Sequence, residues 1–106
     1  MLRRSERARE LNLKALVSFS GACVRVVLQG DEQAPPGLRL RLVHPARAGH
    51  DQAVVLHAVA RGVYEGSFVP SSGETRRLML EDTGSTWQLA GAWNGHEETA
   101  SLAAAR

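Results

Sequence analysis

Leucine and arginine alternate without a break at the start of the segment LRLRLV, residues 38–43. Successive side chains of a β-strand point to opposite sides, so the leucines share one face and the arginines share the other. In an α-helix the same leucines would be spread around the circumference. The segment therefore predicts a strand with one face in an apolar core and the other in water.

The same period of two recurs along most of the chain, and Gly- or Pro-containing turns separate one apolar run from the next. The expected strands are residues 14–20, 22–29, 38–43, 53–59, 63–69, 76–81 and 86–93. About seven short strands without helical periods between them predict an all-β fold, and we expect an immunoglobulin-like antiparallel β-sandwich. A closed barrel is the main alternative.

One core should hold this sandwich, because 106 residues correspond to a single domain. Its expected members are Leu38, Leu40 and Leu42 together with the apolar residues that share one face in the later strands. They are Leu38, Leu40, Leu42, Val54, Leu56, Phe68, Leu78, Leu80, Trp87 and Leu89.

The two ends of the chain differ from the middle in composition. Residues 1–13 are rich in Arg, Glu and Leu and predict a short charged helix, a lead-in or connector to the β-domain at 14–93. Residues 94–106 become polar and then Ala-rich, and we expect a weakly ordered tail because they offer little to bury.

Charge and cysteine content exclude several classes of protein. The net charge is only +2, and residues 1–10 carry this excess, so no basic folded face suited to nucleic acid is expected. Cys23 is the single cysteine, which excludes an internal disulfide, and we expect a small core side chain. No apolar run is long enough for a spanning helix, so the chain as given is expected to be soluble.

His44, His50 and His57 follow one another closely, with Asp51 among them. Imidazole and carboxylate are ligands that copper or zinc would use, so His44, Asp51 and His57 are candidate metal ligands. The structural interpretation is favoured over the metal site. Pro45 makes His44 extended, and the Asp51 carboxylate can accept hydrogen bonds from amides of the 44–51 loop.

The sequence places no potential nucleophile at a spacing from a base that would indicate a catalytic site. Ser71 and Ser72 lie in a turn without a His or a nucleophile-elbow context, and Cys23 has no base placed near it by spacing. We therefore expect a binding protein and not an enzyme.

Aromatic residues anchor many protein interfaces. We therefore expect Tyr64 and Trp93, together with the 44–51 loop, to form the contact surface, although Trp93 also suits a core.

The segment LRLRLVHPARAGHDQAVVLHAVARGVYEGSF resembles the periplasmic domain of the FixH family, membrane-anchored proteins linked to assembly of cbb-type haem–copper cytochrome oxidases. The shared pattern is a strand ending in His-Pro, an Asp that opens the next strand, Tyr-x-Gly and a final Trp-x-Leu-x-Gly strand. Here these residues are His44, Pro45, Asp51, Tyr64, Gly66, Trp87, Leu89 and Gly91. The family's N-terminal membrane helix has no counterpart in these residues.

The resemblance implies a non-enzymatic binding domain on the periplasmic side of the inner membrane, tethered by an N-terminal anchor in the full-length protein. Its expected partners are oxidase subunits or components of a copper pump, and it implies no catalytic residue and no cofactor. The alternative is a copper- or zinc-binding carrier domain of similar architecture. A carbohydrate- or peptide-binding sandwich of unrelated role is a third alternative.

Overall fold

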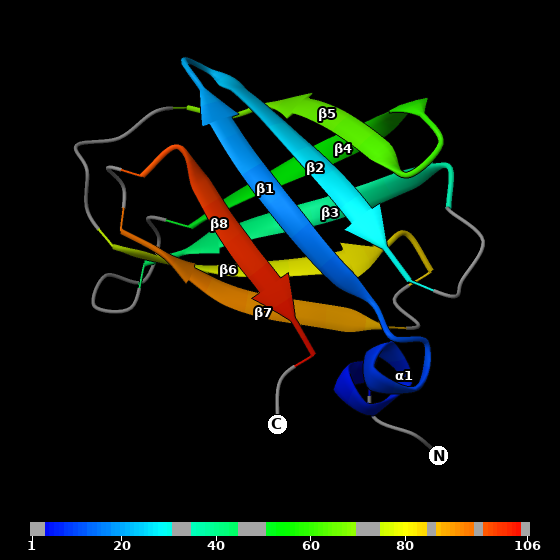
Figure 1. Cartoon of the computed structure of the whole chain (residues 1–106). Helices are drawn as coiled ribbons and strands as arrows, with labels where there is room; N and C mark the ends of the chain where they lie inside the picture. The colour runs from blue at the N-terminus through cyan, green and yellow to red at the C-terminus, as the bar shows by residue number, and fades with distance from the viewer. Residues whose placement is uncertain are drawn as a thin grey trace.

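The computed structural model describes residues 4–30, 35–44, 51–69, 75–84, 87–94 and 97–104. It is an all-β structure with one short helix (Figure 1). The elements are α1 (Arg4–Glu10), β1 (Lys14–Ser20), β2 (Cys23–Gln29), β3 (Gly37–Val43), β4 (Gln52–Ala60), β5 (Val63–Ser67), β6 (Arg76–Asp82), β7 (Gln88–Trp93) and β8 (Thr99–Ala103). No helix in these ranges is long and apolar enough to cross a membrane.

The strands form one closed antiparallel barrel in the order β1-β2-β5-β4-β3-β6-β7-β8, with β8 returning to β1. In Figure 1, β8, β1 and β2 cross in front of β3 and β6. The expected all-β class is confirmed, but eight strands replace the expected seven, and a barrel replaces the immunoglobulin-like sandwich. The reason is β8, which lies between β7 and β1 and closes the sheet.

Strand β8 lies in the segment that was expected to be a weakly ordered tail. Five of its residues pair with β1, from Lys14↔Ala103 to Ser18↔Thr99, whereas only Ala90↔Ala103 pairs it with β7. Ala100 and Leu102 alternate with exposed neighbours and are buried. Alanine favours a helix, but this preference is weak in a short segment, so pairing with β1 and burial of these two side chains decide its conformation.

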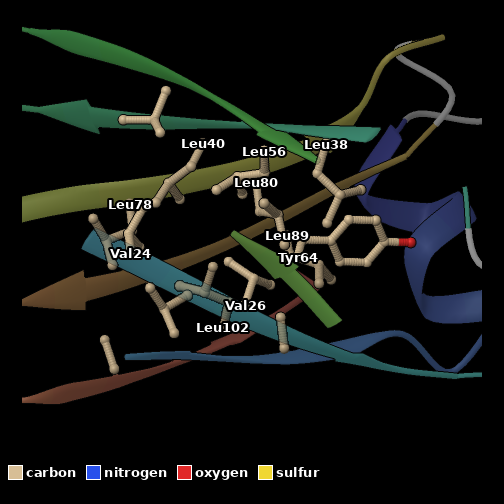
Figure 2. Close-up of a cluster of buried hydrophobic side chains, with 14 of the residues drawn as sticks. Val24, Val26, Leu38, Leu40, Leu56, Tyr64, Leu78, Leu80, Leu89 and Leu102 are labelled. Atoms are coloured by element: carbon tan, nitrogen blue, oxygen red, sulfur yellow. The ribbon is translucent and has the colours of Figure 1, made fainter. Parts of the chain in front are cut away.

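The core contains all ten residues predicted from the alternation, and each of them is buried. Figure 2 shows several of these leucines pointing inward together with side chains of the β1–β2 side of the barrel. Val24, Val26 and Leu102 complete this layer and are likewise buried. The period of two therefore assigned the inner face correctly in the five predicted strands that contain these ten residues.

Helix α1 is shorter than the predicted lead-in and ends in a Schellman motif. Asn12 adopts a positive φ of 53°, the Asn12 amide donates to the Arg9 carbonyl at 3.1 Å, and the Leu13 amide donates to Ala8 at 3.0 Å. Ala8 and Leu13, at the two positions that this motif brings into apolar contact, are both buried. The helix therefore docks through its last turn at one end of the barrel, where it lies near β7 (Figure 1).

Cys23 is exposed, which corrects the expected core position. It is the first residue of β2 and pairs with Ser20 across the Gly21–Ala22 hairpin turn. The next residue, Val24, points into the core. Because neighbouring residues of a strand face opposite sides, Cys23 points outward.

Candidate functional site

The Asp51 carboxylate joins the end of β3 to the start of β4. Its Oδ1 atom accepts a hydrogen bond of 3.1 Å from the His44 amide. This is the kind of contact that the turn interpretation of Asp51 requires. Pro45 and His50 lie outside the described residues.

The candidate metal ligands do not all come together. The β3–β4 register places His57 opposite Gly37, at the start of β3, whereas His44 directly follows the other end of that strand. Seven residues along a strand span roughly 20 Å, so His57 cannot share an ion with His44 or Asp51. The described parts of the chain contain no cluster of three potential metal ligands. The three candidate ligands, which were disfavoured against the turn interpretation, therefore do not form a single site.

Tyr64 is a core residue and not the exposed interface residue that was expected. It is opposite Val26 in the β2–β5 pair and its side chain is fully buried. Its hydroxyl donates a 2.6 Å hydrogen bond to the Pro35 carbonyl, so the polar end of the ring is satisfied within the protein. Figure 2 shows the ring among the core leucines. Desolvation by burial raises the pKa of the Tyr64 phenol.

Trp93 is also buried, with 8% of its surface exposed, so it does not form the expected exposed anchor. Its ring stacks on Phe19, with centroids 3.9 Å apart and planes 13° from parallel, and Phe68 meets both rings edge-on. The indole Nε1 donates a 2.7 Å hydrogen bond to the Glu97 carbonyl. These contacts occupy the ring and its donor, so Trp93 fills one end of the barrel.

An apolar row runs across the outer face of β1, β2, β5 and β4. Leu16 is opposite Val27, and Val27 is opposite Val63 on its other side. Val63 is in turn opposite Ala60 of β4. Val59 precedes Ala60 and lies where the β4–β5 register shifts, between Ala58 and Ala60. Leu16 is 44% exposed and Val59 is 56% exposed, whereas Val27 and Val63 are half-buried. We call Leu16, Val27, Val59 and Val63 the apolar band.

A polar row lies next to the apolar band on the same outer face. Ser18 is opposite Arg25, and Arg25 is opposite Glu65. Arg25 Nε donates to Glu65 Oε2 at 2.8 Å, and both side chains are partly open to solvent. This arrangement, an apolar strip beside hydrogen-bonding and charged groups, is the composition of a protein–protein contact with a dry centre and a polar rim.

The sequence contained a signal for the apolar band, but it is a weak one. Leu16 and Val27 are apolar at the positions that should face water in strands 14–20 and 22–29. Single exposed apolar residues are common and carry no meaning alone. Only the strand order, which sets β5 beside β2, turns these scattered residues into one surface.

No curated protein and no solved structure matches the chain. One family model does match, that of FixH, and it covers residues 1–94.

Proposed function

Because the chain belongs to the FixH family, which is associated with cbb-type haem–copper oxidases, we propose that this barrel is a non-enzymatic binding domain for assembly of such an oxidase. It binds oxidase subunits or components of a copper pump. In the full-length protein an N-terminal anchor holds it on the periplasmic side of the inner membrane.

The observation that carries this proposal is the apolar band. Four aliphatic side chains form a continuous strip over four adjacent strands, and Leu16 and Val59 at its two ends are exposed among the residues that the structure describes. Removing such a strip from water upon contact with a partner would contribute about 25 cal/mol per Å² of apolar surface. A rigid sheet also loses little conformational entropy when it binds, which favours contact through this face.

A membrane tether explains how a weak contact through the apolar band serves in assembly. The band consists of aliphatic residues that are only partly exposed and lacks the exposed Trp, Tyr and Arg anchors of tight interfaces. The isolated domain should therefore bind its partner weakly. Anchoring on the same membrane supplies an effective concentration of about the millimolar range, which makes a weak contact sufficient.

The test uses the full-length, anchored protein in native membranes. Leu16→Ser combined with Val59→Ser makes the band polar without opening the core, and we expect recovery of oxidase subunits or pump components in a pull-down to fall together with oxidase activity. Val55→Ser combined with Val69→Ser is the matched control, because these valines are 58% and 70% exposed but lie outside the band. The control should retain partner recovery and activity.

Two results would contradict the proposal. Normal oxidase activity after deletion of the gene would remove the assembly role. Equal loss of partner recovery in both double variants would show that general surface hydrophobicity, and not the apolar band, governs the contact.

A further inference from the structure

A second surface lies on the outer face of β3, β6 and β7. It contains a hollow of about 480 Å³ lined by Thr75, Arg76, Arg77, Ala90, Gly91 and Ala92. The hollow exists because two outward residues of β7, Ala90 and Ala92, are opposite the much longer Met79 and Arg77 of β6. The long side chains of one strand therefore form a wall beside the short side chains of the next.

Two arginines on this face have no acidic partner among the residues that the structure describes. Arg41 and Arg77 are exposed, and within those residues neither forms an ion pair or a hydrogen bond, whereas Arg39 in the next row is bonded to Glu81 at 3.0 Å. Arg77 lines the hollow, and Arg41 lies on the neighbouring strand β3. Exposed guanidinium groups of this kind are suited to a carboxylate, which each can bind through two parallel hydrogen bonds.

The spacing of the two arginines indicates the form of the acidic ligand. Arg41 is opposite Met79, so Arg77 occupies the diagonal position on β6. Diagonal neighbours of an antiparallel pair are roughly 7–8 Å apart. In an extended chain, side chains on the same face recur every second residue, at roughly 6.6 Å. Two acidic residues in an extended i, i+2 arrangement would therefore match both arginines.

We propose that this face binds an extended acidic segment of a partner protein, with carboxylates at positions i and i+2 on Arg41 and Arg77 and a small apolar side chain at i+4, on the same face, in the hollow beside Arg77. We call Arg41, Arg77 and the hollow the acidic-segment site. It lies on different strands from the apolar band and does not depend on the proposed role in oxidase assembly.

The test titrates the folded chain with the short capped peptide Glu-Ser-Glu-Ser-Ala, in which both glutamates and the alanine share one face of the extended chain, and follows the backbone amides by NMR. We expect saturable shifts at Ala90, Gly91 and Ala92. Arg41→Gln combined with Arg77→Gln should weaken binding by about tenfold, since each exposed ion pair contributes up to about 1 kcal/mol. The same peptide with lysine in place of glutamate should not bind.

A matched control separates this site from general attraction to a basic chain. Lys14→Gln combined with Arg61→Gln removes the same charge from two exposed cations, which also have no ion pair with any described residue and lie on other strands or turns. It should change affinity by less than about twofold. Dispersed amide spectra would establish that both double variants are folded.

Several outcomes would overturn the proposal. Equal weakening in both double variants would indicate nonspecific attraction, and shifts confined to other strands would place the contact elsewhere. Glutarate binding as tightly as the peptide would reduce the site to a free-anion site. Binding to vesicles of phosphatidylglycerol that is lost in the Arg41/Arg77 variant, without binding of the peptide, would assign this face to a membrane surface.

Discussion

At the scale of single residues, Tyr64 combines a fully buried ring with a hydroxyl bonded to the Pro35 carbonyl. This hydrogen bond connects β5, which contains Tyr64, to the segment just before β3, which contains Pro35. Burial raises the pKa of the phenol, so the folded state retains the proton at pH values where the unfolded chain, with a pKa of about 10, has lost it. The stabilisation is therefore complete below about pH 10 and is lost as the pH rises through the folded pKa.

Urea denaturation against pH tests this coupling. We expect the midpoint of the wild-type chain to fall above about pH 10, and the midpoint of Tyr64→Phe to fall less steeply, because phenylalanine cannot ionise. At neutral pH the same substitution should cost about 1 kcal/mol through the lost hydrogen bond. Tyr64 is the single tyrosine, so phenolate absorbance follows its titration directly. Ionisation at the pKa of free tyrosine would show that the ring is not buried.

At the scale of elements, β8 determines whether the sheet is open or closed. Its pairing with β1 extends over five residues, and Leu102 points into the core with 2% of its surface exposed. Its side chain also lies against Gly91 of β7, where a Cβ atom would come within 2.5 Å of the Leu102 Cδ2 atom. Closure of the barrel therefore depends on the Leu102 side chain, which fills the space that Gly91 leaves free because it has no side chain.

Leu102→Ala should lower the free energy of unfolding by about 2–5 kcal/mol, the usual cost of removing a buried leucine side chain. Ser101→Ala, one residue earlier on the exposed face, should change it by less than about 0.5 kcal/mol. Both values come from urea denaturation monitored by circular dichroism. A cost for Leu102→Ala as small as that for Ser101→Ala would mean that β8 is not part of the barrel.

At the scale of the whole molecule, the two tryptophans report on opposite ends of one core. Trp87 directly precedes β7 and Trp93 ends it, and both are buried in the same apolar cluster. If the core is a single cooperative unit, Trp87→Phe and Trp93→Phe each leave one reporter whose fluorescence changes in the same transition as the circular dichroism. Within either variant, separate midpoints for the two signals would contradict a single unit.

The sequence by itself determined which face is buried in the five predicted strands that contain the ten expected core residues. Side chains alternate along a strand, so the position of each leucine in 38–43 and its counterparts fixed the inner face without knowledge of the neighbouring strand. The hairpin turn at Gly21, where φ is 58°, was readable for the same reason, since it depends only on adjacent residues.

Only the tertiary structure decided which strands are neighbours. Strand β8 became part of the barrel through contacts with β1, more than 80 residues away in the chain, and no local pattern encodes such a pairing. The β3–β4 register separated His57 from His44, and the β2–β5 register buried Tyr64. The apolar band and the Arg41–Arg77 pair exist for the same reason, because lateral pairing assembles them from residues that are unremarkable one strand at a time.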